Sequence, residues 1–169
     1  MMTIQCTKKM LDSMKVKPEP KPGDEQDALY AWHANLLMLQ RRKFILLMNN
    51  KTRYNFLIGP VTKKEMAKFE KIMRQELAAN LAADGTDEEL IKAYLSRMDG
   101  VRFTKTSERS ILGQLNESAF YIEAILDSGE SVSLSDINRR LNEFVMLKLP
   151  LVYSGKTMIA ELTGRFAGH

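Results

Sequence analysis

The sequence predicts an α+β fold, in which an antiparallel β-meander sheet packs against about four α-helices. Three observations favour this class. Apolar runs separated by short polar turns dominate residues 29–58, helical periodicity dominates residues 62–150, and residues 101–106 alternate like a strand between two of the helices. The chain of 169 residues is 44% hydrophobic and 27% charged, a composition that suits one domain with a core of ordinary size.

The N-terminal part predicts a short strand followed by an exposed loop. Residues 3–7 alternate between β-branched and polar side chains, and a helical turn is expected at residues 8–14. Residues 15–27 contain three prolines and a glycine among charged side chains, which is typical of an extended, exposed loop. The piece before this loop is too short to be a domain, so we expect residues 1–169 to form a single domain.

The meander is predicted from three apolar runs at residues 29–39, 43–49 and 53–59. The first two runs are separated by Gln-Arg-Arg, and the next two by Asn-Lys-Thr. Asparagine tolerates positive φ, so a tight turn is expected near Asn50. Such strands bury one face, and we expect the helices that follow to cover it.

Helices are expected downstream because apolar residues recur there at spacings of three and four. The first spans residues 62–83. The second begins at Thr86, where the spacing to Glu89 predicts a capping box.

Two more helices follow the alternating segment. One is expected at residues 107–127, and the other begins at Ser133 or Ser135 and ends before Pro150. Residues 151–169 are weakly patterned, and we expect them to form a weakly structured C-terminal segment.

The sequence also indicates a cytoplasmic location. No run approaches the roughly 20 apolar residues of a membrane span. The first ten residues are polar and basic where a signal peptide would need its apolar stretch. Cys6 is the single cysteine, so no internal disulfide can form, as is usual for cytosolic proteins.

The net charge of +4 is unevenly distributed along the chain. Residues 1–27 sum to zero, residues 28–64 to +7 without a single acidic side chain, and residues 65–169 to −3. A segment of this kind would present one positive surface if it folds as a unit, and a positive surface attracts phosphate or acidic protein. The structural alternative is that strands are depleted in Asp and Glu in any case.

Several short strings resemble a family of small, uncharacterised bacterial proteins that is catalogued as a domain of unknown function. Their order and spacing match over most of the chain. The resemblance implies a bacterial, single-domain, cytosolic protein, and it carries no activity, substrate or catalytic residue. The strings are Cys6-Thr7-Lys8-Lys9, Trp32-His33-Ala34-Asn35, Arg41-Arg42-Lys43, Lys105-Thr106, Arg109-Ser110-Ile111-Leu112-Gly113 with Asn116, and Arg140-Leu141-Asn142.

One of these strings suggests an anion pocket. Arg109 and Asn116 are two helical turns apart and share a face of the expected third helix, and Lys105 precedes that helix's N-terminus. These three residues are therefore candidates for an anion clamp. The alternative is that Arg109 and Asn116 make structural hydrogen bonds to the loops of the meander.

The sequence does not match the motifs of several common phosphate-binding and metal-binding sites, either in spacing or in composition. Ser154-Gly155-Lys156-Thr157 ends like a P-loop, but Pro150 stands where that loop needs its first glycine. Cys6, His33 and His169 are too few for a zinc site, and the basic segment has no carboxylates for the metal ions of a nuclease. We therefore expect no metal and no cofactor.

Two weaker patterns involve the predicted strands. Cys6 and His33 would form a nucleophile–base pair if their strands were neighbours, but a lone strand cysteine is usually a small buried hydrophobe. Trp32 and Tyr30 lie near the basic turn and would stack nucleic-acid bases if exposed, but aromatics in a meander are usually core.

Three functions follow from these observations. The favoured one is a non-catalytic binding or regulatory module that contacts a polyanion, either DNA or RNA or an acidic protein, through the basic meander. Its candidate contact residues are Arg41, Arg42, Lys43, Lys51 and Arg53.

The first alternative is an enzyme acting on a phosphorylated or anionic small molecule. Lys105, Arg109 and Asn116 would hold the anion, and His33 is the candidate catalytic acid or base. The second alternative is a homo-oligomer that uses an exposed sheet face. No interaction with a membrane is expected.

Overall fold

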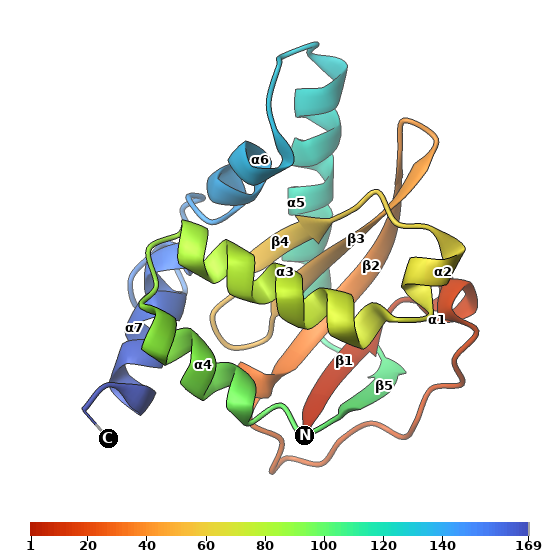
Figure 1. The fold of residues 1–169 in the computed structure, drawn as a ribbon. Coiled ribbons are helices and arrows are strands. Elements are labelled where there is room, and N and C mark those ends of the chain that lie inside the picture. The colour runs from red at the N-terminus through yellow and green to blue at the C-terminus, as the bar shows by residue number, and fades with distance from the viewer. Residues whose placement is uncertain (169) are drawn as a thin grey trace.

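The computed structural model describes residues 1–168, which are arranged around a mixed five-stranded β-sheet (Figure 1). The strand order is β4-β3-β2-β1-β5. Antiparallel pairing joins β2 to β3 and β3 to β4, whereas β1 is parallel to both of its neighbours. The strands are β1 Met2–Cys6, β2 Ala31–Leu39, β3 Arg42–Asn49, β4 Asn55–Ile58 and β5 Val101–Lys105.

The expected antiparallel sheet with about four helices is therefore wrong in two respects. The meander forms as β2, β3 and β4, but β1 and β5 add parallel pairs, so the sheet is mixed. Parallel strands need a crossover of a dozen or more residues, and residues 7–30 and 7–100 supply it on the two sides of β1. Alternation within a strand predicts which face a side chain takes and does not fix the direction of the neighbouring strand.

The described residues also form seven α-helices rather than four. The helix expected at residues 62–83 is divided into α2 and α3, and the segment 151–169, expected to be weakly structured, contains α7. A short 3-10 helix, Ala28–Tyr30, precedes β2. The α-helices are α1 Lys8–Met14, α2 Lys63–Met66, α3 Phe69–Ala83, α4 Glu88–Ser96, α5 Arg109–Asp127, α6 Leu134–Leu141 and α7 Ser154–Phe166.

Local capping explains where several helices begin. Thr62 with Glu65 forms a capping box at α2, and Ser133 with Asp136 forms one at α6, so both orphan backbone donors are satisfied reciprocally. The capping box expected at Thr86 does not form. Asp87 is the N-cap of α4, and the Thr86 hydroxyl is buried without a hydrogen-bond partner.

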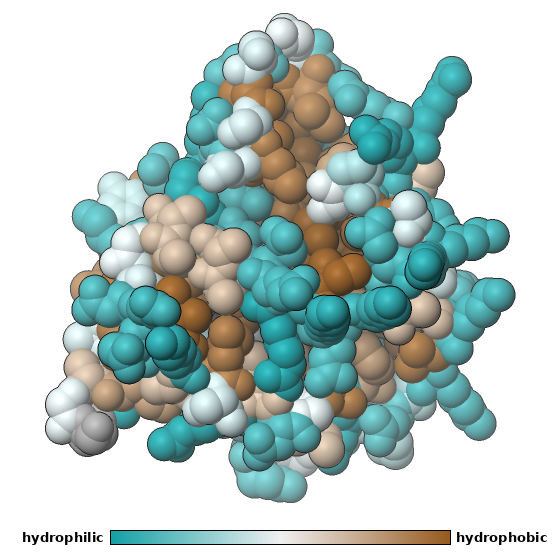
Figure 2. Space-filling view, viewed as in Figure 1, coloured by the Kyte–Doolittle hydropathy of each residue, from teal (hydrophilic) through white to brown (hydrophobic). Residues whose placement is uncertain are grey.

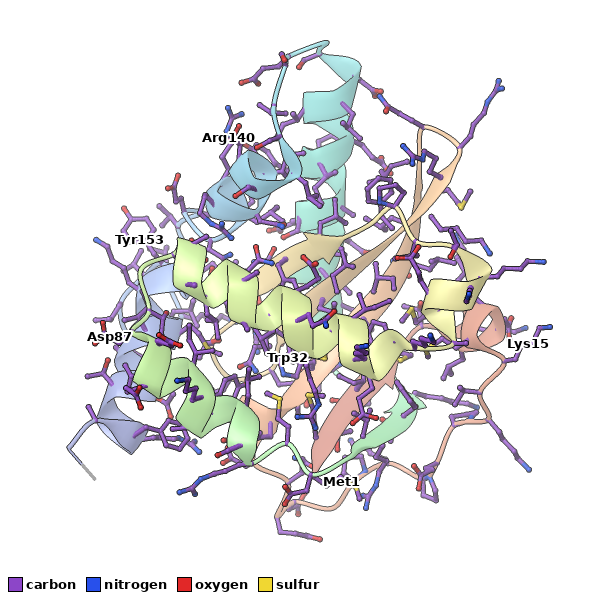
Figure 3. The ribbon with its side chains drawn as sticks, in the orientation of Figure 1. Met1, Lys15, Trp32, Asp87, Arg140 and Tyr153 are labelled. Atoms are coloured by element: carbon purple, nitrogen blue, oxygen red, sulfur yellow. The ribbon has the colours of Figure 1, made fainter. Side chains whose placement is uncertain are left out.

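One face of the sheet carries the larger hydrophobic core. The helices α3 and α4 lie in front of the sheet in Figure 1, with α7 beside α4. Trp32 is fully buried under α3 (Figure 3), and its ring meets Phe56 edge-on with centroids 5.8 Å apart. Leu77 of α3 and Tyr94 of α4 complete this layer.

The opposite face is covered by α5 and α6, where Leu46 and Met48 of β3 pack with Leu115 and Ile122 of α5. Polar sheet residues on β1 and β5, such as Gln5, are buried as well. Neither face of the sheet is left open within residues 1–168. The sheet face on which a homo-oligomeric interface was expected to form is therefore occupied by helices and loops.

The outer edge of β4 is closed by two asparagines, Asn138 of α6 and Asn142 at the C-cap of this helix. The Asn142 amide accepts from the Asn55 N–H at 2.9 Å and donates to the Asn55 carbonyl at 2.8 Å. One turn earlier, Asn138 does the same for Leu57, at 2.7 and 3.1 Å. Each amide side chain thus makes the pair of hydrogen bonds that a residue of a neighbouring strand would make. The N–H and carbonyl groups on the outer side of β4, an edge strand, therefore have partners.

None of the helices among residues 1–168 combines the length and the apolar character that a membrane span requires.

Truncating Asn142 tests the importance of this edge closure. We expect Asn142→Ala to lower the free energy of unfolding by about 2–4 kcal/mol, because it leaves two buried backbone groups of Asn55 without partners. Denaturant unfolding measures the change. The matched control is Asn116→Ala on the exposed face of α5, which should change the free energy by less than about 0.5 kcal/mol. Equal effects of the two substitutions would contradict the role assigned to Asn142.

Candidate functional site

Four of the five strands run toward one edge of the sheet, because β1, β2, β4 and β5 share a direction. The segments that follow these strands therefore gather there. They are α1 after β1, the turn after β2, α2 after β4 and residues 105–108 after β5 (Figure 1, right). In open sheets, ligands commonly bind beyond the carboxyl ends of parallel strands.

Two of these segments begin with the same three residues. Thr7 caps α1 and Thr62 caps α2, and each threonine is followed by two lysines, Lys8-Lys9 and Lys63-Lys64. The first turn of a helix disfavours cations because of the helix dipole. The helix dipole therefore does not account for lysines at this position, and none of the four forms a salt bridge within residues 1–168.

The turn between β2 and β3 brings further cations to the same edge. Gln40 and Arg41 both have positive φ, at 51° and 66°, as a two-residue hairpin turn requires. Glycine or asparagine usually occupies such positions, so a glutamine and an arginine here carry backbone strain. Beside the turn, the Val61 N–H donates to the Lys43 carbonyl at 2.8 Å, which holds α2 against the hairpin.

Together these segments form a surface at the carboxyl ends of β1, β2, β4 and β5, which we call the basic edge. On the elements that supply it, Asp12, Glu65 and Glu108 are the acidic residues. Long hydrophilic side chains project from this side in Figure 2, and nitrogen-tipped ones surround Lys15 in Figure 3. Eight of its nine cationic side chains are exposed, Lys43 is half-buried, and none forms a salt bridge within residues 1–168. They are Lys8, Lys9, Lys15, Arg41, Arg42, Lys43, Lys63, Lys64 and Lys105.

The structure does not bring the other two predicted meander cations to this surface. Lys51 and Arg53 follow β3, at the opposite end of the sheet. Lys51 pairs with Glu161 at 2.9 Å, and the Arg53 guanidinium donates to Gln114 of α5 and to the Asn50 carbonyl. Both charges are thus engaged within the protein.

A pocket of about 440 Å³ opens at the carboxyl ends of β1 and β5. We call it the α1–β5 pocket. Cys6 and Lys105 lie opposite each other in the strand register, which brings two of the strings quoted for the resemblance together. Next to the pocket, the side-chain oxygen of Asn35, from a third string, accepts a hydrogen bond from the Thr7 hydroxyl at 2.8 Å. The pocket is lined by Cys6, Lys8, Leu11, Asp12, Val16, Pro18, Lys105 and Thr106.

The predicted anion clamp is not assembled as a unit. Lys105 lines the α1–β5 pocket, whereas Arg109 and Asn116 lie on α5 and line none of the pockets described for residues 1–168. Ile111 and Leu115 face the sheet, so helical spacing directs Arg109 and Asn116 to solvent, and both are exposed. Neither makes a hydrogen bond through its side chain to the rest of the described chain.

His33, the candidate acid or base, is fully buried beneath α5. Its Nδ1 is 2.8 Å from the Asn50 side-chain oxygen, and Asn50 donates in turn to Gln5 at 2.7 Å. Gln5 donates to Ser107 at 2.9 Å, so the chain of hydrogen bonds links β2 and β1 with the segments that follow β3 and β5. His33 lines none of the pockets described for residues 1–168 and holds the meander against β1 and the start of α5.

The other strand residues considered for chemistry are also structural. Cys6 packs in the core under α3, and its neighbour Gln5 pairs with His33 in the register, so the Cys6 and His33 side chains point to opposite faces of the sheet. Burial raises the pKa of the Cys6 thiol to about 12, which excludes a thiolate nucleophile near neutral pH. Trp32 and Tyr30 are buried, so neither presents a ring for base stacking.

A further polar cluster joins α3, α6 and α7 next to a pocket of about 450 Å³. Tyr54 donates to Asp84, and Arg139 pairs with Asp84 at 2.7 Å. Burial raises the pKa of Asp84, and that of Tyr54 also rises, chiefly through burial. The string Ser154–Thr157 forms the first turn of α7 here and follows no strand of the sheet, unlike a P-loop.

No group of three or more His, Cys, Asp or Glu side chains suited to a metal ion occurs within residues 1–168.

Charge summation along the chain missed Lys8, Lys9 and Lys15. Five acidic side chains balance the five basic ones of residues 1–27, so this segment sums to zero. In space, Asp27 pairs with Arg165 of α7, and Glu25 lines a pocket with Met1 and Arg97 at the amino end of β1, away from α1. The repeated Thr-Lys-Lys at residues 7–9 and 62–64 is the sequence signal that points to the α1 lysines.

The buried His33 predicts an acid-sensitive fold. Burial lowers the pKa of His33 from 6.5, so the unfolded chain binds a proton that the folded chain excludes. We therefore expect the free energy of unfolding to fall as the pH falls below about 6.5.

Substituting His33→Gln should flatten this dependence, because glutamine retains an amide for Asn50 and takes up no proton. Denaturant titrations of both proteins across the acid range measure the two slopes. Asp84 titrates in both proteins, so the difference between the slopes reports on His33. Parallel slopes would contradict the prediction.

Comparison with known proteins agrees with the resemblance drawn from the sequence strings. Residues 3–155 match a family described as "Domain of unknown function (DUF6933)". No curated protein and no solved structure matches the chain. The match covers the sheet apart from Met2, as well as α1 to α6, the basic edge and the α1–β5 pocket. The chain therefore belongs to the family of the domain of unknown function DUF6933.

Proposed function

We propose that this protein is a non-catalytic binding module whose basic edge contacts the phosphates of a nucleic acid. The observation that carries the proposal is the convergence of nine unpaired cations from separate segments on one edge of the sheet. Phosphate contacts of this kind supply most of the affinity of non-specific nucleic-acid binding. A bacterial cytoplasmic location, where nucleic acid is accessible, is part of the proposal.

The composition of the basic edge favours nucleic acid over an acidic protein. Seven of its nine cations are lysines. Lysine is depleted at protein–protein interfaces, which are usually centred on buried aromatic or apolar anchors. Met38 is the large exposed apolar side chain near the hairpin turn, and no aromatic side chain is exposed among the elements of this edge.

The geometry gives less support to an enzyme. His33 is enclosed, the Cys6 thiol is held protonated, and the three residues of the predicted clamp are dispersed. General acid–base catalysis requires a proton donor or acceptor within reach of a bound substrate.

Salt-dependent binding tests the proposal. We expect purified protein to bind short labelled DNA or RNA with an affinity that falls steeply with salt, because every neutralised phosphate releases counterions. The triple variant Arg41→Ala, Arg42→Ala, Lys43→Ala should weaken binding and lower the slope of log affinity against log salt by about 0.7–0.9 per lost contact. Fluorescence anisotropy at several salt concentrations measures both quantities.

The matched control removes the same charge elsewhere, through Lys92→Ala, Lys148→Ala and Lys156→Ala. An equal loss of affinity in both variants would show that the effect depends on net charge and not on the position of the cations. No binding even at low salt would overturn the proposal. Displacement of the nucleic acid by polyglutamate of equal charge would indicate an acidic protein as the partner instead.

A further inference from the structure

The α1–β5 pocket differs in chemistry from the surface around it. Four of its lining residues, Cys6, Leu11, Val16 and Pro18, are apolar or weakly polar. Its volume of about 440 Å³ falls within the range of small-molecule sites, roughly 300–1,000 Å³. A surface that contacts only phosphates has no need of an apolar cavity.

The pocket is preformed, because the loop that closes it is pinned at two points. The Val16 N–H donates to the Leu11 carbonyl at 3.2 Å, which holds the start of the loop against the C-terminal turn of α1. The Glu19 N–H donates to the Phe103 carbonyl at 2.8 Å, which attaches the loop to the outer edge of β5. Pro18 lies between these two points and stiffens the wall.

Cations surround the opening on both sides. Lys8 and Lys105 line the pocket and are exposed. A second groove of about 610 Å³ shares Pro18, Lys105 and Thr106 with the pocket and continues past Lys17 and Lys21. The apolar cavity therefore adjoins a groove that three lysines line together with one carboxylate, that of Glu19.

Asp12 indicates what enters the pocket. It is the carboxylate among the lining residues, and it would repel a phosphate placed inside. A carboxylate accepts hydrogen bonds from the exocyclic amino group of cytosine, adenine or guanine, which thymine and uracil lack.

From this arrangement we infer that the ligand of the basic edge is single-stranded nucleic acid, with one unpaired, amino-bearing base in the α1–β5 pocket. The phosphates on either side of this base lie against Lys8 and Lys105. The inference rests on the proposed function and adds the strandedness and the class of base. A base within a duplex is stacked and paired, so it does not enter such a pocket without leaving the helix.

An abasic probe separates base binding from phosphate binding. We expect a short deoxycytidine oligonucleotide to bind about tenfold more tightly than an abasic oligonucleotide with the same number of phosphates. The same cytidine strand in a duplex should lose this advantage. Anisotropy titrations with the unmodified protein measure all three affinities, so the comparison does not depend on the folding of a variant.

Substitution of Asp12 tests base selection. Asp12→Ala should reduce the ratio of cytidine to thymidine oligonucleotide affinities toward one, whereas Asp24→Ala, an equal charge change in the exposed loop, should leave this ratio unchanged. The ratio is the readout because either substitution alters the general attraction for phosphate.

The outcomes distinguish the two proposals. Salt-dependent binding that is equal for cytidine and abasic probes would overturn the base pocket and leave the basic edge as a phosphate surface. Failure of every probe to bind at low salt would overturn both proposals. If cytidine monophosphate binds as tightly as the oligonucleotide, the pocket serves a mononucleotide, and the inference of a single strand is wrong.

Discussion

The parallel placement of β1 between β2 and β5 determines where the candidate residues lie. Because these strands share a direction, α1, the β2–β3 turn and the segment after β5 all leave the sheet at one edge. Reversing β1 would move Lys8 and Lys9 to the opposite edge, beside the ion pair of Lys51 and Glu161. The basic edge and the α1–β5 pocket are therefore consequences of strand direction as much as of composition.

Buried polar groups maintain this arrangement. Asn138 and Asn142 close one side of the sheet, and the chain of hydrogen bonds from His33 through Asn50 to Gln5 fixes the meander against β1. Buried polar side chains are costly unless they are paired, and once paired they favour one geometry. Three polar members of the quoted strings, His33, Asn35 and Asn142, are paired within the protein in this way. The cations of the same strings at positions 41, 42, 105 and 109 remain exposed.

Much of the fold could be predicted from local patterns, whereas the arrangement in space could not. Alternation and turns predicted β2, β3 and β4, and helical spacing predicted most of α3 to α6, because these signals act over a few residues. Strand direction and the position of β1 depend on contacts roughly a hundred residues apart, which no local pattern contains. The same limit applied to the site. Arg41 to Lys43 were visible as a charged run, but the link between Lys8 and Lys105 exists only once β1 and β5 are paired.

Pairing of β1 with β5 also sets an order of events during synthesis. The hairpins of β2, β3 and β4 can form as soon as residues 31–58 leave the ribosome, so the cations of the β2–β3 turn take their places early. The other side of β1 cannot pair until residues 101–105 have been synthesised. Until then the pocket lacks the wall that Lys105 and Thr106 form. If the basic edge binds polyanions as proposed, a nascent chain would attract them before the pocket proposed to discriminate among them is complete.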